Sequence, residues 1–164
     1  PRGNVVMVNW KTPFKKIEIG KERKIKDGKA IAILSIGHPG NLVTEAITKL
    51  NEENINPAHY DMRFAKPLDE NLLHEVFKNY SNIITVEDGC VIGGIGSDIL
   101  EFMGDNHYTA NVKRLGIPDK WVEHGEQSEL YEECGFSPEK IIETVKQILN
   151  STTDKTKLNN FNEA

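Results

Sequence analysis

Residues 61–69, Asp-Met-Arg-Phe-Ala-Lys-Pro-Leu-Asp, place charged side chains where an apolar strand pattern gives way to a helix pattern. Asp61, Arg63 and Lys66 could form ion pairs among themselves, or the two cations could bind an anionic substrate. Asp61 and Arg63 are two residues apart, which puts them on the same face of an extended strand. From their chemistry alone, we favour a salt bridge within or between domains over a substrate site.

A pair of adjacent acids, Glu87 and Asp88, stands at the end of another apolar stretch. Paired carboxylates can act as general acid and base or hold a metal ion. Neighbouring residues in a strand point to opposite faces, however, so a shared catalytic site is disfavoured. We expect one of the two acids to cap the helix that follows and the other to face a neighbouring domain.

The glycine-rich turn at residues 89–96 follows a strand pattern and precedes a helix pattern. Backbone N–H groups in such a turn could bind an anion. A dinucleotide fingerprint would need a third glycine where Ile99 stands, and no Gly-Lys-Ser/Thr follows to make a phosphate-binding P-loop. We therefore favour close packing of the helix start on the sheet, with anion binding as the alternative.

The remaining reactive side chains form no self-contained active site. None of the five histidines (His38, His59, His74, His107 and His124) has metal-ligand spacing with another. His124 could face a cleft, but a structural role in its loop is the favoured interpretation. Cys90 and Cys134 form no CxxC pair, so we predict two reduced thiols without a disulfide or a metal.

Apolar runs and helical periodicities alternate along the chain, which predicts the elements that must position these residues. Strands are expected at residues 17–27, 30–36, 58–64, 82–86 and 110–115. Helices are expected at residues 42–54, 70–80, 95–103 and 127–133, with a last one from 138. The expected N-caps are Asn41, Asp69 and Ser137. This pattern predicts an α/β fold: a mostly parallel five-stranded sheet with one antiparallel edge strand and helices on both faces.

Length and composition fit one compact domain, since the chain has 164 residues, of which 38% are hydrophobic. The net charge is -5 with no basic stripe, which argues against nucleic acid as a partner. There is no apolar run of the roughly 20 residues that a membrane helix needs and no signal-peptide pattern, so we expect a cytoplasmic protein without a membrane partner.

We expect an extended interdomain segment at residues 1–16, the α/β domain at 17–150 and a disordered tail at 151–164. The chain begins with Pro1 rather than Met, which suggests a fragment of a longer protein.

Several stretches together resemble the C-terminal, third domain of the 1-deoxy-D-xylulose-5-phosphate synthase family, in the transketolase superfamily. They are Pro-Arg-Gly-Asn at residues 1–4, the 61–69 stretch, Gly-Gly-Ile-Gly-Ser at 93–97 and Leu-Gly-Ile-Pro-Asp at 115–119. The resemblance extends to about residue 150 and implies a fold like that of the transketolase C-terminal domain. It also implies a homodimeric enzyme of three domains per chain, which condenses pyruvate with glyceraldehyde 3-phosphate and releases CO2. Thiamine diphosphate and magnesium are the implied cofactors, bound between the first two domains.

The resemblance carries two functional residues onto this sequence. Arg2 occupies the arginine of the Pro-Arg-Gly motif and Arg63 that of the Asp-x-Arg-Phe motif, and both family arginines hold the substrate phosphate. For Arg63, phosphate binding and a plain salt bridge both remain open. The cofactor motifs belong to the earlier domains. We therefore expect this chain alone to bind no cofactor, to be catalytically inert, and to contribute assembly and phosphate anchoring to its own first two domains and to the homodimer.

The sequence departs from the family pattern at one place, and two other identities of the chain stay open. Residues 88–90 read Asp-Gly-Cys where the family more often has Glu-Asn-Ala, which puts any specific role of Asp88 in doubt. The chain could instead be the C-terminal domain of another transketolase-superfamily enzyme, such as a 2-oxo-acid dehydrogenase β subunit. It could also be a free-standing, non-enzymatic α/β binding module.

Overall fold

Strands and helices alternate along the chain, as the sequence predicts. The computed structural model describes residue 13 and residues 15–162. The strands are β1 (Arg23–Lys26), β2 (Ile31–Ser35), β3 (Ala58–Asp61), β4 (Asn82–Cys90) and β5 (Asn111–Ile117). The helices are α1 (Pro39–Glu52), α2 (Glu70–Asn79), α3 (Ile95–Asp105), α4 (Gln127–Cys134) and α5 (Pro138–Asn162).

The strands form one five-stranded sheet in the order β1-β3-β2-β4-β5. β1 pairs antiparallel with β3, and the other neighbouring strands pair parallel. Parallel neighbours need a crossover connection, and α1, α2 and α3 supply it. The predicted mixed sheet with one antiparallel edge strand is therefore confirmed.

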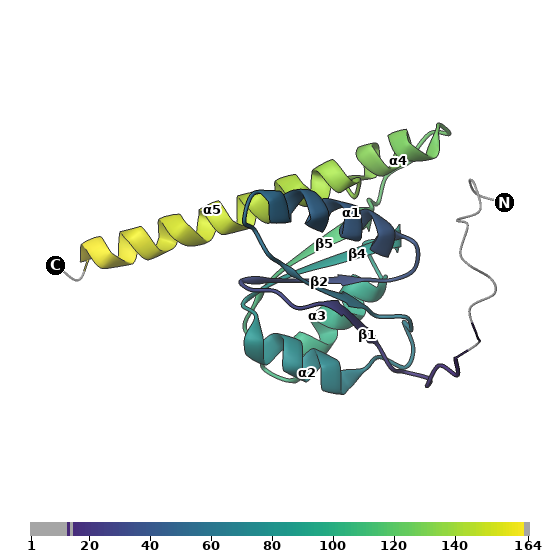
Figure 1. Ribbon diagram of the computed structural model, residues 1–164, viewed down its shortest axis with the longest axis horizontal. Helices are drawn as coiled ribbons and strands as arrows, with labels where there is room; N and C mark the ends of the chain where they lie inside the picture. The colour runs from purple at the N-terminus through teal and green to yellow at the C-terminus, as the bar shows by residue number, and fades with distance from the viewer. Residues whose placement is uncertain (1–12, 14, 163–164) are drawn as a thin grey trace.

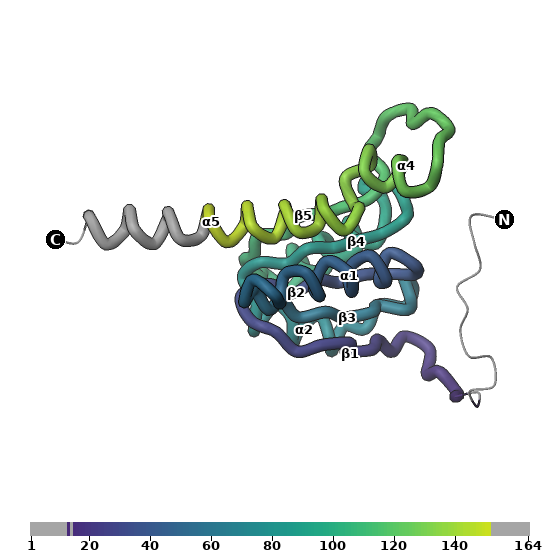
Figure 2. Tube along the Cα trace, turned by 45° about the horizontal axis from the view of Figure 1, so that its top comes forward, coloured from purple at the N-terminus to yellow at the C-terminus, as the bar shows by residue number. Residues whose placement is uncertain are grey.

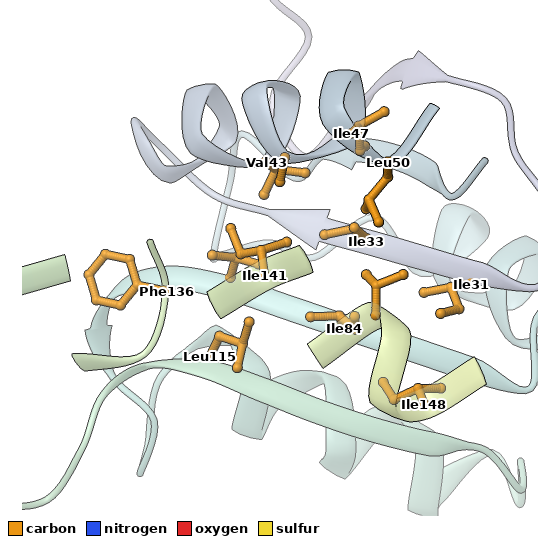
Figure 3. Close-up of a cluster of buried hydrophobic side chains, with 13 residues drawn as sticks. Ile31, Ile33, Val43, Ile47, Leu50, Ile84, Leu115, Phe136, Ile141 and Ile148 are labelled. Carbon is orange, nitrogen blue, oxygen red and sulfur yellow. The ribbon is translucent and has the colours of Figure 1, made fainter. Parts of the chain in front are cut away.

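Helices cover both faces of the sheet, with α1 and α5 on one face and α2 and α3 on the other (Figure 1). Every residue of β2 is buried, because alternate side chains enter the two cores. Ile31 and Ile33 pack with Val43 of α1 and Ile141 of α5 (Figure 3). On the opposite face, Ala32 and Leu34 pack with residues of α2 and α3.

Two of the three predicted helix caps are confirmed. The carboxylate of Asp69 accepts a hydrogen bond from the backbone N–H of Leu72 at 3.2 Å. The hydroxyl of Ser137 accepts one from the N–H of Lys140, also at 3.2 Å. The prediction of Asn41 as a cap is wrong, because α1 already begins at Pro39. Proline suits the first helical position, where its fixed φ is favourable and no N–H is needed.

Several element boundaries differ from the expected ones. The edge strand is confined to β1, four residues long, and β3 ends at Asp61 rather than at residue 64. β4 continues to Cys90, through the two acids. α5 continues to Asn162, so the backbone is helical over most of the stretch where a disordered tail was expected. The residues after 150 contain neither glycine nor proline, so nothing in them forces the helix to end.

Two further predictions concern the N-terminal segment and a membrane-spanning helix. Most of the expected interdomain segment at 1–16 lies outside the described residues, and so does Arg2. In the part of the chain that the structure describes, no helix combines the length and the apolar character needed to cross a bilayer.

Candidate functional site

Asp61, Arg63, Glu87 and Asp88, which were singled out from the sequence, lie at the same edge of the sheet. β2, β3, β4 and β5 run parallel and end there, and β1, which runs the other way, begins there with Arg23. In open α/β sheets this carboxyl edge is where ligands bind. The candidate site is therefore built from loops that follow the strand ends.

Glu87 binds the backbone at the end of the glycine-rich turn from the protein interior. Its carboxylate accepts hydrogen bonds from the backbone N–H groups of Ile95 and Gly96, each at 3.0 Å, and its side chain is buried. The positive N-terminal end of the α3 dipole also stabilises a carboxylate at this position. The expected helix cap is thus confirmed, and the alternative of an anion bound by these two amides is wrong because Glu87 already occupies them.

Asp88 lies on the other side of β4, as strand alternation predicts. Its Oδ2 is 3.8 Å from Nδ1 of His38, the residue before α1. Nε2 of His38 lies 2.6 Å from the hydroxyl of Tyr131 in α4. Sequence reasoning missed this contact because it joins residues 93 positions apart.

Arg114 of β5 fixes the glycine-rich turn from the neighbouring strand. Its Nη1 donates to the carbonyl of Val91 and, at 2.8 Å, to the hydroxyl of Ser97. The same hydroxyl accepts from the N–H of Gly93 at 3.0 Å. The turn is therefore held in one shape by side chains of this domain. Nothing in the local sequence of β5 indicated this role for Arg114.

Arg63 lies just past the end of β3, in a left-handed backbone conformation with φ 56°. Its backbone N–H donates to Oδ1 of Asp61 at 3.2 Å, and its Nη1 donates to the carbonyl of Glu22 at 3.5 Å. The ion pair of Asp61 is formed with Arg23, at 3.1 Å. The expectation that Asp61 and Arg63 share one strand face is wrong, because the strand ends between them.

Glu22 is a neighbour of Arg63 that the sequence did not indicate. Burial raises the pKa of Glu22, the carboxylates of Asp69 and Glu75 raise it further, and Arg63 opposes the shift. Its Oε2 is buried without a hydrogen-bond partner in the described part of the chain. Arg63 and Glu22 thus form a half-buried polar patch beside β1.

A cavity of about 980 Å³ opens at the same edge, beyond the ends of β4 and β5. Its walls come from the loop after β5 and from α4, and they include Asp88, Trp121, His124 and Tyr131. His124 therefore lines a cleft, which was the alternative considered for it, and its structural role in the loop stays a prediction. Cys134 also lines this cavity, and both cysteines are free, as predicted.

The described residues do not fit a diphosphate and magnesium site. No group of three or more His, Cys, Asp or Glu side chains among them could hold a metal ion. The amides of Ile95 and Gly96, which could have bound a phosphate, are taken by Glu87.

The fold and edge geometry agree with a known family. Residues 20–141 match the family described as Transketolase, C-terminal domain. The chain belongs to this family. Among solved structures, this transketolase C-terminal domain is similar to a split-gene transketolase in an inactive β4 tetramer, with 29% identity and a TM-score of 0.76 over 83% of this chain and 44% of that one. It shares only the fold with the transketolase of Campylobacter jejuni, at 17% identity and a TM-score of 0.58 over 78% of this chain and 18% of that one.

Curated relatives indicate which transketolase-type enzyme the domain is similar to in sequence. The domain is 63% identical over 148 residues to the 1-deoxy-D-xylulose-5-phosphate synthase of Cytophaga hutchinsonii, covering 90% of this chain and 23% of that protein. It is 52% identical over 149 residues to the synthase of Bacteroides thetaiotaomicron, with the same shares of 90% and 23%. The chain therefore spans about a quarter of the length of the synthases that it matches.

Proposed function

We propose that this chain is the C-terminal domain of a 1-deoxy-D-xylulose-5-phosphate synthase. That enzyme would condense pyruvate with glyceraldehyde 3-phosphate, release CO2 and depend on thiamine diphosphate and magnesium. The observation that carries the proposal is the 63% identity to the Cytophaga hutchinsonii synthase over 148 residues. The motif at residues 61–69 supports the synthase over a 2-oxo-acid dehydrogenase β subunit or a free-standing binding module.

Within such an enzyme, we propose that the domain serves assembly and substrate binding rather than cofactor chemistry. Its partners would be the first two domains of its own chain, which would hold the cofactor, and a second copy in a cytoplasmic homodimer. The poor fit of the described residues to a diphosphate and metal site supports this division. The chain alone would then be catalytically inert.

The experiment that tests the function is a domain exchange. The segment of the Cytophaga hutchinsonii synthase that matches this chain is replaced by this chain, and synthase activity is measured for the chimera, the parent enzyme and the chain alone. We expect the chimera to be active within about tenfold of the parent, equivalent to about 1.4 kcal/mol in activation free energy, and the chain alone to be inactive. A chimera that assembles like the parent but makes no product would contradict the proposal.

Arg63 should anchor the substrate phosphate, together with Arg2. In the active chimera, we expect Arg63→Asn to raise KM for glyceraldehyde 3-phosphate about tenfold or more, equal to about 1.4 kcal/mol, with KM for pyruvate unchanged. Asparagine is the chosen replacement because it tolerates the left-handed backbone of this position. Steady-state kinetics with each substrate varied in turn provides the measurement.

A matched control separates the position of the guanidinium from its charge. Arg23 lies at the same edge, and its side chain is more than half exposed and paired with Asp61. Arg23→Gln should leave both KM values near those of the parent chimera. If Arg63→Asn also leaves them unchanged, Arg63 serves only local structure, and Arg2→Ala then tests the remaining candidate.

A further inference from the structure

The loop after β5 and helix α4 contribute no fully buried residue to the core of this domain. We define the acidic segment as residues 117–134, from the end of β5 to the end of α4. α4 contributes no buried residue. Tyr131 joins it to the body of the domain, through His38 and through ring packing on Phe136 with centroids 5.0 Å apart. Figure 2 shows α4 and the loop before it standing out from the sheet.

The acidic segment lines the cavity of about 980 Å³ with apolar side chains that alternate with Glu123, His124 and Glu126. Trp121 is 87% exposed, the largest exposed fraction among the large hydrophobic side chains of the described residues. Ile117, Val122 and Leu130 line the same cavity. An exposed tryptophan beside an open apolar cavity is typical of a protein interface, where aromatic residues are enriched.

The charge of the segment indicates the chemistry of its partner. Six acids (Asp119, Glu123, Glu126, Glu129, Glu132 and Glu133) stand in it against one base, Lys120, which is paired with Glu133 at 3.0 Å. The net charge of the segment is therefore -5, which equals the net charge of the whole chain, so the other residues are neutral in sum. Asp88 adds a further carboxylate to the cavity wall. A surface of this kind favours a basic partner.

We propose that the acidic segment is a docking surface for a basic polypeptide face of the other two domains of the synthase, with an apolar side chain of that face seated in the cavity beside Trp121. The inference rests on the proposed function. It adds the surface by which this domain is held, on the edge of the sheet that also carries Arg63. A polypeptide partner is favoured over a small ligand because Glu129, Glu132 and Glu133 of α4 are not among the residues that line the cavity.

Hydrogen exchange tests the docking surface. Amide exchange of residues 118–126 is measured by mass spectrometry for the chain alone and for the chimera with the Cytophaga hutchinsonii synthase. We expect exchange to be about tenfold slower or more in the chimera, because docking would close the openings through which these amides exchange. Residues of α3, on the other face of the sheet, provide the internal reference.

Variants identify the contacts. In the chimera, Trp121→Ala or Glu123→Lys should return exchange of residues 118–126 to within about threefold of the rate in the chain alone. The matched controls are Ile19→Ala, which removes an apolar side chain that is 74% exposed, and Glu101→Lys, which reverses an exposed charge on α3. Both controls should keep the protection.

The outcomes separate the docking surface from the proposed function. An active chimera with unprotected residues 118–126 overturns the docking surface and leaves the function standing. An inactive chimera counts against the function, while the exchange still decides the docking, since protection supports it and fast exchange overturns it. Protection in the chain alone that rises with its concentration would assign the surface to a second copy and also overturn the proposal.

Discussion

Replacing Gly94 with alanine should lower the free energy of unfolding by about 3 kcal/mol or more, within the range of strongly overpacked sites. A β-carbon at this position would lie 2.2 Å from Oε2 of Glu87 and 2.3 Å from the carbonyl oxygen of Cys90. Either the backbone of the turn or the Glu87 carboxylate must move. If Glu87 moves, the amides of Ile95 and Gly96 lose their acceptor while still buried.

The same helix offers a control of opposite sign. A β-carbon at Gly104, in the last turn of α3, would have no heavy atom within 4 Å. Gly104→Ala should therefore raise the free energy of unfolding by up to about 1 kcal/mol, because alanine favours the helix and restricts the unfolded chain. Urea denaturation of both variants measures the two effects. A Gly94→Ala protein as stable as the wild type would show that Glu87 does not hold the turn.

The parts of the fold that follow local rules could be predicted from the sequence. Strand alternation assigned Glu87 and Asp88 to opposite faces, and Glu87 indeed caps α3. Asp69 directly precedes the apolar pattern of α2 and caps that helix. The nearly continuous apolar run around β2 indicated a central strand covered on both faces, which is where it lies. The two capping contacts join residues at most nine positions apart in the sequence, and the burial of β2 follows from the pattern of a single strand.

The rest of the site depends on contacts between distant parts of the chain. Asp61 pairs with Arg23, which is 38 residues away, because the antiparallel edge strand brings the two together. β3 is also shorter than predicted. It ends at Asp61, and Arg63 beyond it takes a left-handed backbone conformation that the propensity of arginine does not indicate. Tyr131, which lines the cavity, packs beside His38, and hydrophobic periodicity carries no signal for such a contact.

His59 should make the domain less stable in mild acid. It lies in β3 with 2% of its surface exposed, its Nε2 is 2.8 Å from the hydroxyl of Ser35, and its Nδ1 has no partner among the described residues. Burial lowers the pKa of His59 from 6.5 to about 4, with a smaller opposing effect of Asp61 and a lowering effect of Arg23. The unfolded chain therefore binds a proton near pH 6.5, which the folded protein does not bind until about pH 4.

This difference in proton binding lowers the free energy of unfolding as the pH falls. Stability is unaffected by His59 well above pH 6.5, and it falls with decreasing pH until the folded pKa of about 4 is reached. The total loss is about 3 kcal/mol, of which about 2 kcal/mol is already lost at about pH 5. Carboxylates elsewhere also change their charge in this range, so the wild type alone cannot isolate the effect.

The decisive measurement compares the wild type with His59→Gln, which removes the titrating ring but keeps a polar group that can reach Ser35. The difference between their free energies of unfolding, from urea denaturation at about pH 8 and at about pH 5, cancels the contribution of the carboxylates. We expect the advantage of the wild type to shrink by about 2 kcal/mol at the lower pH. An advantage that stays constant would mean that His59 is protonated in the folded protein without cost, and that the pocket around Ser35 admits water or a counter-charge.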